Sequence, residues 1–573
     1  MFVRVLSSAV VGLAVMAAGS FSAWGQDMPP AGQPDASQTA AMEATSIATP
    51  VTTEAVNTEE RSLSDLDGQA DAFILSTSRE RVDIRFFLPP HVDTTEAWLR
   101  LAARPASDST GGLIHVSVNG GEAITIRPQA RAMEARFALF SDDFRPGENT
   151  LELAYSTDMP APGWIVDARR SQIRLTLEPT GVIDTLESLE AALAADFAAP
   201  RRIALITDES RDRVTLESLV AQGLALRAGQ VPLFTSDAAE ADLVVRIADN
   251  DRLAADDRAA LRSGDRSNGP EIGFRNDGIP HLVITGRNLD EAVAAARLMA
   301  ARSFVGYRQT FIAADAMTAA RLGVRQIRDA RTMHTDADLR TFADSGLPFS
   351  ADQGSRTAVQ FSTRFDADRH GALSVLARAA LISGEAWLYA WYGDADDVAP
   401  ADHNLLVIGP GSTEIAAVDR NAPPELRAAL RAAERSRGQR GLMRLAAAAY
   451  ADAADAEVGT EVGIGVASLF RDQANDGRWI ATLTAPDMAS FEAAGRSLAR
   501  SDLWTALEGR AAVWSARGVT ALDYAIVAPT MTDRIQEFAV DHTRDAAFLL
   551  MGAAFLLLMR AFFGRRKRVR VQS

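Results

Sequence analysis

The sequence predicts a multidomain mixed fold: an N-terminal β-sandwich (jelly-roll-like), two α/β (flavodoxin-like) domains and a single C-terminal transmembrane helix. Three observations predict this fold class. Apolar residues recur at every second position in the first third of the body, and helix-like and strand-like segments alternate in the remainder. An apolar run followed at once by a cluster of cations lies near the C-terminus.

Residues 1–25 have the pattern of a secretory signal peptide. Arg4 precedes an apolar stretch at 5–18, and Ala23 and Gly25 place small residues before a cleavage point at Gln26. The stretch is short for a membrane span of roughly 20 residues, so cleavage is favoured over an uncleaved anchor. Residues 26–65 are rich in Pro, Ala, Thr and Ser and poor in aromatics, which predicts a disordered linker.

Residues 66–179 are predicted to form the β-sandwich. Val82, Ile84 and Phe86 alternate with charged residues, which is the pattern of a half-buried strand. Asn119-Gly120-Gly121 follows another alternating run and predicts a hairpin turn. Short strands separated by turns at regular intervals are typical of a sandwich.

From residue 180 onward the pattern predicts α/β structure. The first α/β domain is placed at 180–330, a shortened connector at 331–368 and the second α/β domain at 369–528. The connector has room for two strands, near 358–361 and Phe365, but not for a domain. The two α/β domains are weakly repeated in pattern. The helices are expected at 186–193, 214–226, 289–301 and 372–381, and the strands at 203–206, 231–234, 243–247, 282–287, 386–391, 404–409 and 478–484.

The C-terminal region is predicted to contact a membrane. Residues 529–544 form an amphipathic interface helix with Met531, Ile535 and Phe538 on one face, and packing against the second α/β domain is an equal alternative. Residues 545–563 form the transmembrane helix, whose apolar run begins at Ala546 and is interrupted by Arg560 near its end. The basic tail, 564–573, marks the cytoplasmic side. The expected location is the bacterial inner membrane, single-pass, with the body in the periplasm.

Composition argues against several classes of function. The chain has no cysteine and seven scattered histidines, so neither disulfides nor a zinc site is expected. A net charge of −16 argues against nucleic acid as a partner. No phosphate-binding loop lysine or nucleophile elbow is present, and the carboxylate pairs Asp142-Asp143 and Asp396-Asp397 lie among turn residues. The chain is therefore not expected to be an enzyme, nor to hold a metal or cofactor.

Two tryptophans in the predicted sandwich are candidate carbohydrate contacts. Trp164 follows a Pro- and Gly-rich stretch, and Trp98 follows a turn, so either indole could present a face to a sugar ring. A core position is the alternative for both. Trp387, Tyr389 and Trp391 alternate along a predicted strand and are expected to serve packing.

The order of these parts resembles the BcsB family, the periplasmic regulatory subunit of bacterial cellulose synthase. Local stretches at 116–120, 146–151, 285–287 and 507–514, and Trp164 ahead of 171–173, are similar as well. The family is often labelled cyclic di-GMP-binding. That nucleotide is cytoplasmic whereas the predicted body is not, so no cofactor is expected here.

The resemblance implies a non-catalytic subunit of a cellulose (β-glucan) synthase complex. Its soluble, carbohydrate-binding-like domains would guide the nascent glucan across the periplasm, and its anchor would bind a membrane-embedded processive glycosyltransferase that uses UDP-glucose. The implied partner- and membrane-binding residues are Met531, Ile535, Phe538, Phe548, Leu549, Phe555, Leu556, Arg560, Arg565 and Arg566.

The chain departs from the family pattern at one place. The family usually has a second carbohydrate-binding sandwich between its α/β domains, where this chain has only the connector. The sequence therefore looks like a short variant, and the polymer stays open. Two alternatives remain: a periplasmic carbohydrate-active enzyme of the envelope, or a scaffold without sugar contact.

Overall fold

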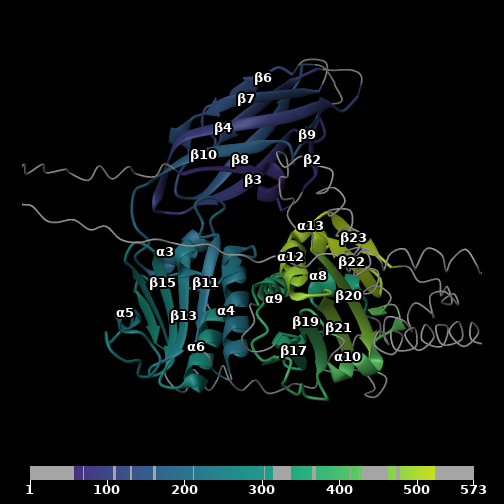
Figure 1. The fold of residues 1–573 in the computed structure, drawn as a ribbon. Helices are drawn as coiled ribbons and strands as arrows, with labels where there is room; N and C mark the ends of the chain where they lie inside the picture. Colours follow the sequence, from purple (N-terminus) through teal and green to yellow (C-terminus); the bar gives the residue numbers. More distant parts are fainter. Residues whose placement is uncertain are drawn as a thin grey trace, which may run out of the picture. The chain divides into compact units, whose positions relative to one another are not determined.

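The computed structural model describes residues 57–522 with gaps (Figure 1). The gaps are residues 69, 108–110, 129–131, 159–162, 209, 211, 302, 314–336, 364–368, 413–414, 425, 428–462 and 473–477. All described residues belong to one compact unit of the chain.

The predicted β-sandwich is confirmed and consists of two antiparallel sheets. One sheet has the order β1-β10-β4-β9-β2, with β7 also paired to β4, and the other has the order β3-β8-β5-β6. Buried apolar side chains of both sheets form one hydrophobic cluster between them. The strands are β1 (Asn57–Ser62), β2 (Ala72–Leu75), β3 (Arg81–Leu88), β4 (Val92–Pro105), β5 (Leu113–Val118), β6 (Ile124–Ile126), β7 (Met133–Leu139), β8 (Gly147–Ser156), β9 (Trp164–Asp167) and β10 (Gln172–Pro179).

Local sequence explains the regular parts of the sandwich. β3 alternates strictly between exposed and buried positions, so Val82, Ile84 and Phe86 face the core as predicted. The turn between β5 and β6 places Asn119 at φ 52° and Gly120 at φ 72°. A tight hairpin turn requires positive φ at both central residues, and Asn and Gly tolerate it best. The predicted hairpin turn is thereby confirmed.

The sandwich begins earlier than expected. Strand β1 lies inside the predicted linker, 26–65, and pairs with β10 along its whole length. It is followed by the single turn α2 (Leu63–Leu66), whose first turn is capped by the Ser62 hydroxyl. The sandwich therefore includes residues 57–62, which the composition of the sequence assigned to a disordered linker.

Two α/β domains follow, and their sheets share one strand order. The first sheet runs β12-β11-β13-β15-β14-β16 and the second runs β18-β17-β19-β21-β20-β22-β23. If the strands of each sheet are numbered from 1 in chain order, both sheets have the spatial order 2-1-3-5-4-6, and the second sheet adds a seventh strand at its end. This shared order confirms the internal repetition that the sequence predicted. The strands are β11 (Arg202–Thr207), β12 (Leu233–Thr235), β13 (Leu243–Asp249), β14 (Glu271–Asn276), β15 (Pro280–Gly286), β16 (Phe311–Ala313), β17 (Thr357–Phe361), β18 (Trp391–Gly393), β19 (Asn404–Ile408), β20 (Ile464–Arg471), β21 (Trp479–Thr484), β22 (Ala511–Ser515) and β23 (Gly518–Ala521).

Neither sheet is wholly parallel. In each, the first four strands of the spatial order are parallel, and β14 or β20 then pairs antiparallel with its neighbour. A flavodoxin-like sheet is parallel throughout and has the order 2-1-3-4-5. The two sheets share its first three strands and then depart from it, so the predicted α/β class holds whereas the flavodoxin-like designation is not established.

A layer of helices lies between the two sheets (Figure 1). Helix α4 packs against α6 and against α9, and α9 also packs against α12. Apolar residues of both α/β domains join in one buried cluster at this layer. The helices are α3 (Leu186–Leu193), α4 (Arg213–Ala228), α5 (Ala255–Arg258), α6 (Leu289–Ala301), α8 (Leu339–Ser345), α9 (His370–Ser383), α10 (Ala416–Asn421), α12 (Met488–Leu498) and α13 (Ser501–Trp504), with short 3₁₀ turns η1 (Ser141–Asp143), η2 (Ala238–Glu240) and η3 (Ala351–Gly354).

Three expectations for the α/β region need correction. The strand predicted near 358–361 is confirmed as β17, but it lies between β18 and β19 in the second sheet, and α8 precedes it, so the described part of the predicted connector (331–368) is not a separate segment. The strand predicted at 386–391 begins only at Trp391 and ends at Gly393. Five strands of the two sheets were not anticipated: β14, β16, β20, β22 and β23. Phe365, predicted to lie in a strand, falls outside the described residues.

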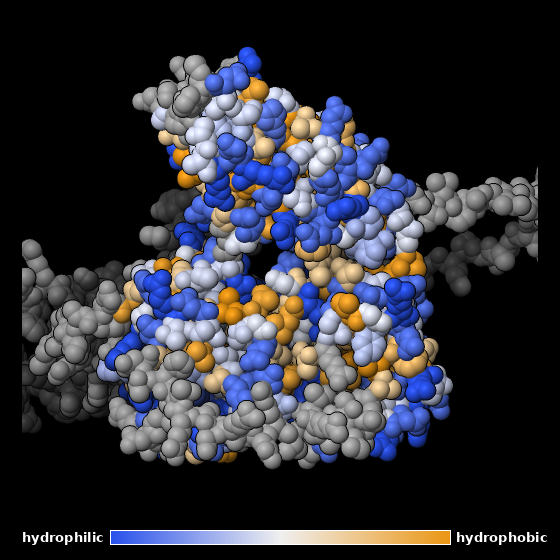
Figure 2. All heavy atoms as spheres, turned by 180° about the vertical axis from the view of Figure 1, so that it is seen from behind, coloured by the Kyte–Doolittle hydropathy of each residue, from blue (hydrophilic) through white to orange (hydrophobic). Residues whose placement is uncertain are grey.

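One face of the described part of the chain is largely hydrophilic. Figure 2 shows that hydrophilic side chains predominate on this face and that some hydrophobic ones gather near its middle. The exposed large apolar side chains of the described residues come from widely separated elements: Ile74, Phe87, Phe140, Val182, Leu233, Ile279, Val305 and Val398. Exposure of scattered apolar residues is ordinary for proteins, so it does not by itself mark a binding site.

The segment between α3 and β11 packs into the sandwich. Phe197 is fully buried among the core residues of the sandwich, and its ring centroid lies 5.8 Å from that of Phe86 in an edge-to-face arrangement. The backbone N–H of Phe87 donates a hydrogen bond of 2.7 Å to the Asp196 carboxylate. The sandwich core is therefore completed by a residue from the region that the sequence assigned to the first α/β domain.

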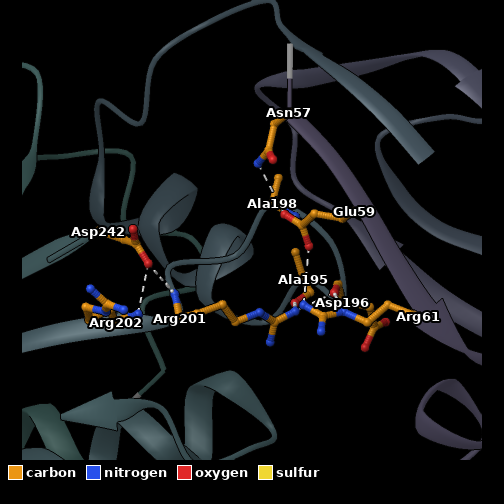
Figure 3. Close-up of polar contacts among 9 residues, drawn as sticks. All are labelled: Asn57, Glu59, Arg61, Ala195, Asp196, Ala198, Arg201, Arg202 and Asp242. Carbon is orange, nitrogen blue, oxygen red and sulfur yellow. Dashed lines mark hydrogen bonds and ion pairs between the residues drawn. The ribbon is translucent and has the colours of Figure 1, made fainter. Parts of the chain in front are cut away.

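Charged side chains reinforce this junction (Figure 3). The Glu59 carboxylate accepts a hydrogen bond of 2.9 Å from the Ala198 N–H, and Arg61 donates through Nε to the Asp196 carbonyl oxygen at 3.1 Å. Arg201 also donates to that carbonyl. Burial lowers the pKa of Arg201 to about 10, assisted by the nearby positive charge of Arg61. Strand β1 and the segment before β11 are thus held together by polar contacts as well as by Phe197.

No helix within the described part of the chain is both long and apolar enough to cross a membrane. The predicted interface helix (529–544), transmembrane helix (545–563), basic tail (564–573) and signal peptide (1–25) all lie outside the described residues.

Candidate functional site

Trp98 stands on the outer face of the larger sandwich sheet. It belongs to β4, where its neighbours Ala97 and Leu99 point into the core and are buried. The register places Arg174 of β10 directly opposite Trp98, and Glu60 of β1 opposite Arg174. Three adjacent strands therefore align an acid, a guanidinium and an indole in one row across the sheet.

A second row lies one pleat further along the same face. Gln172 of β10 is opposite Arg100 of β4, and Arg100 is opposite Arg136 of β7. The guanidinium carbon of Arg136 lies 4.9 Å from the centroid of the Trp98 ring, a cation–π contact that ties the two rows together. The indole is half-buried as a result, with its orientation fixed by its neighbours.

Glu134 organises the charges of the second row. Arg100 donates through Nε to Glu134 Oε1 at 2.7 Å, and Arg170 donates to Glu134 Oε2 at 2.9 Å. Arg100 also donates to the Gln172 side-chain carbonyl at 3.1 Å. The hydrogen bond from Arg100 is the largest cause that lowers the pKa of Glu134, and Arg170 lowers it further. Glu134 therefore stays ionised at lower pH than an ordinary glutamate does.

These residues surround an open depression of about 390 Å³. A volume of this size falls within the range of roughly 300–1,000 Å³ that small-molecule sites occupy. Its lining combines one aromatic ring with guanidinium, carboxylate and amide groups. The lining residues are Glu60, Trp98, Arg100, Glu134, Ala135, Arg136, Gln172 and Arg174.

Trp164, the other predicted carbohydrate contact, is a core residue. Only 1% of its surface is exposed, and its indole N–H donates to the Gly111 carbonyl oxygen at 3.3 Å. Gly163 before it has φ 88°, and a Cβ there would lie 1.9 Å from the Leu75 carbonyl oxygen, so the chain enters β9 in close contact with β2. A buried indole has no free face, and Trp164 cannot stack on a sugar in this fold.

The remaining predicted site residues are not placed. The partner- and membrane-binding residues all lie outside the described part of the chain: Met531, Ile535, Phe538, Phe548, Leu549, Phe555, Leu556, Arg560, Arg565 and Arg566. The carboxylates Asp142 and Asp143 lie in the single turn η1. Among the described residues, no group of three histidine, aspartate or glutamate side chains could hold a metal ion.

Sequence reasoning found Trp98 but missed the residues around it. Arg100, Glu134, Arg136, Gln172 and Arg174 occupy polar positions of three alternating strands, and each resembles an ordinary solvent-facing residue. The available signal was that all three strands carry arginine at such a position. Only the pairing register shows that these positions are adjacent.

No protein-family model matches the chain, and no curated protein matches it either. Among solved structures, an exo-β-1,3-galactanase from Phanerochaete chrysosporium is 17% identical, over 21% of this chain and 26% of its own, at a TM-score of 0.14. The CBM35 module of Abf62 from Cellvibrio japonicus is also 17% identical, over 22% of this chain and 99% of its own, at a TM-score of 0.14.

A third structure is the C-terminal CBM6 module of LamC, a marine laminarinase from Zobellia galactanivorans. It is 13% identical, over 21% of this chain and 99% of its own, at a TM-score of 0.13. At such TM-scores these likenesses do not assign a ligand or an activity, so any function for this chain has to be argued from its own side chains.

Proposed function

We propose that this chain is a non-catalytic carbohydrate-binding protein whose β-sandwich holds a polysaccharide at the depression around Trp98. The observation that carries the proposal is a half-buried indole surrounded by hydrogen-bonding groups on one face of the sheet. A sugar ring has C–H groups on its faces and hydroxyls at its rim. It therefore fits an aromatic surface that is surrounded by donors and acceptors.

The polar side chains have complementary roles in this proposal. Arg174 lies beside Trp98 and can donate to sugar hydroxyls, whereas Glu60 beyond it can accept from them. Arg100 is oriented by Glu134 and Gln172, so its remaining N–H groups are held in place before a ligand arrives. Such preorganisation lowers the entropy that binding costs.

The charge of the depression bears on which polysaccharide is bound. Its lining has three arginines and two glutamates, and Glu134 is already engaged by Arg100 and Arg170. A neutral β-glucan would use the arginines as hydrogen-bond donors, and an anionic polymer would use them as counter-charges. We favour the neutral glucan because its hydroxyls can both accept from the arginines and donate to Glu60, whereas an anionic polymer would be repelled by Glu60.

The second part of the proposal is that the chain is a subunit of a glucan synthase complex. It would be the membrane-anchored periplasmic subunit of a cellulose (β-glucan) synthase complex at the bacterial inner membrane. It would bind the membrane-embedded processive glycosyltransferase through its C-terminal helix and guide the nascent glucan, with no cofactor and no nucleic acid. The support for this part is the predicted signal peptide, amphipathic segment, apolar run and basic tail.

The carbohydrate-binding part is tested by substituting Trp98 in the full-length protein. Trp98→Ala should weaken the binding of cellohexaose, measured by titration calorimetry, by about tenfold or more because the stacking surface is lost. Phe140→Ala is the matched control, since Phe140 is an exposed aromatic of the sandwich that does not line the depression. Equal affinity for all three proteins would contradict the proposal and favour a scaffold without sugar contact.

Two further measurements test the polymer and the partner. Oligogalacturonate of matched length should bind more weakly than cellohexaose, and the opposite preference would replace the glucan by an anionic polymer. Deletion of residues 546–573 should abolish co-purification with a membrane glycosyltransferase and reduce polymer output. Unchanged association and output would remove the synthase assignment while leaving the sandwich site untouched.

A further inference from the structure

A second cavity lies where the two α/β domains meet. It has a volume of about 380 Å³, which again falls in the range of roughly 300–1,000 Å³ typical of small-molecule sites. Helix α4 contributes Asp212 and Thr215 from its start, and α6 contributes Asp290, Val293 and Arg297. Residues 390–392, at the start of β18, complete the lining.

The β18 wall offers main chain rather than an aromatic ring. The Trp391 side chain packs on the other face of the sheet, in an apolar cluster that includes Ala358 and Leu405. β18 is the end strand of its sheet within the described residues, so main-chain groups of one edge have no strand partner there. Because residues 390–392 line the cavity, the strand can offer these N–H and C=O groups to an extended peptide.

The charged side chains of the cavity are separated along α6. Asp290, Val293 and Arg297 recur at i, i+3 and i+7, which puts them on one side of the helix. At a rise of 1.5 Å per residue, Asp290 and Arg297 are about 10 Å apart along the axis. Helices α4 and α6 both follow parallel strands of the first sheet, so both begin at the same edge. Asp212 therefore adds its carboxylate at the Asp290 end.

Arg297 is a half-buried cation without a counter-charge in the described part of the chain. Its Nε donates to the Leu388 carbonyl oxygen at 3.0 Å, and its guanidinium carbon lies 5.9 Å from the centroid of the Tyr389 ring. Burial lowers the pKa of Arg297, and the groups that act against this lowering are Tyr389 and Tyr392 rather than a carboxylate. A carboxylate on a ligand would supply the missing charge through charge-assisted hydrogen bonds.

We propose that this cavity binds a short zwitterionic peptide, with its ammonium group at Asp212 and Asp290 and its carboxylate at Arg297. A purely cationic ligand would meet the guanidinium, and a purely anionic one would meet the two carboxylates. A peptide with free ends satisfies both. Two or three extended residues span roughly 7–11 Å, which suits the separation of the charges along α6. The inference goes beyond the carbohydrate site and does not depend on it.

The ends of the ligand provide the first test. Trialanine should bind the full-length protein in titration calorimetry. N-acetyl-trialanine lacks the ammonium group and trialanine amide lacks the carboxylate, so each should bind about tenfold or more weakly through loss of one charge-assisted contact. If trialanine does not bind, or if the peptide with both ends blocked binds equally well, the proposal is overturned.

Variants of the lining provide the second test. Arg297→Gln should bind trialanine and its amide equally, because the carboxylate has lost its partner. Asp212→Asn combined with Asp290→Asn should bind trialanine and its N-acetyl form equally. Asp256→Asn is the matched control, since Asp256 is an exposed carboxylate of α5 that does not line the cavity, and it should keep the wild-type preferences. Circular dichroism checks that each variant folds.

The same variants separate this site from the sandwich. Arg297→Gln should leave the affinity for cellohexaose unchanged, because the depression around Trp98 is elsewhere. If the wild-type preferences for free peptide ends persist in the lining variants, the peptide binds at another place and the inference is overturned. If Trp98→Ala removes the binding of trialanine, that place is the sandwich, and the carbohydrate proposal is judged by cellohexaose alone.

Discussion

The guanidinium of Arg369 lies 3.3 Å from the carboxylate of Glu217, and these two side chains, 1% and 5% exposed, link the two α/β domains. Glu217 lies on α4 and also accepts from Arg213 at 2.7 Å, whereas Arg369 immediately precedes α9. Because both charges are removed from water, loss of one partner of this pair should cost more stability than loss of one partner of an exposed pair.

Glu217→Gln should destabilise the protein by about 3–5 kcal/mol, because it leaves the Arg369 guanidinium buried without a counter-charge. Urea unfolding followed by circular dichroism measures the effect. The double variant Glu217→Leu with Arg369→Met should recover most of the loss, since an apolar pair of similar volume needs no desolvation of charge.

The control for this prediction is the exposed pair Arg202 and Glu240, whose side chains are 42% and 64% exposed. Glu240→Gln should change stability by no more than about 1 kcal/mol. A loss for Glu217→Gln as small as that for Glu240→Gln would show that the buried pair does not hold the domains together.

Phe197→Ala should destabilise the sandwich by about 3–5 kcal/mol, because it removes a fully buried ring and leaves a cavity beside Phe86. Val305→Ala provides the control, since Val305 is 72% exposed and its truncation should cost within about 0.5 kcal/mol. Near-ultraviolet circular dichroism during urea unfolding reports the loss. If both variants unfold like the wild type, the segment before β11 is not part of the sandwich core.

The affinity for cellohexaose should stay constant as the pH falls from about 8 to 5, and it should decrease only at a pH below the ordinary glutamate pKa of 4.5. The pKa of Glu134 is lowered from its ordinary 4.5, first by the hydrogen bond from Arg100, so the carboxylate that orients Arg100 persists until the pH falls through this lowered value. Glu134→Gln should weaken binding at every pH and remove the acidic drop. Glu148→Gln, on an exposed carboxylate of β8 outside the depression, should reproduce the wild-type profile.

The stability of the sandwich should decrease as the pH falls below about 6.5. Burial lowers the pKa of His91 from its ordinary 6.5, so the folded state holds a neutral imidazole while the unfolded chain becomes protonated. The unfolded state then binds more protons, and the stabilisation present above pH 6.5 is lost towards the folded pKa. Urea midpoints at pH 7.5 and 5.5 measure this loss.

His91→Leu should flatten that pH dependence, because the leucine cannot be protonated in either state. His115→Gln is the control, since the His115 ring lies on β5 and hydrogen-bonds to Thr125 and Ser156. A wild-type slope that survives in His91→Leu would assign the effect to another group.

Much of the regular structure could be predicted because it depends on local periodicity. Helix α6 has the predicted bounds because Ala292, Ala295, Ala296 and Met299 recur at helical spacing and are all buried. Strand β1 could not be predicted, since Asn-Thr-Glu-Glu-Arg-Ser contains no apolar residue. It is a strand because β10 offers a pairing edge and because Glu59 reaches Ala198, and both contacts are distant in sequence.

The candidate site was predictable to a smaller extent. Trp98 and Trp164 both follow turn-forming residues, and nothing local separates a half-buried indole from a buried one. The difference arises from Leu75, Gly111 and Tyr155, which surround the start of β9 and come from three other segments. The partners of Trp98 likewise come from β1, β7 and β10, whose alignment depends on register rather than on composition.

Because the two sheets share one strand order, the contact between the α/β domains pairs corresponding elements. Helices α4 and α9 each follow the first strand of their sheet in chain order, and they pack against each other. Equivalent helices of the two domains therefore meet, as equivalent helices of two identical subunits meet in a homodimer. In such a dimer every contact occurs twice. Joined in one chain, the two copies are free to differ, and Glu217 needs to meet Arg369 only once.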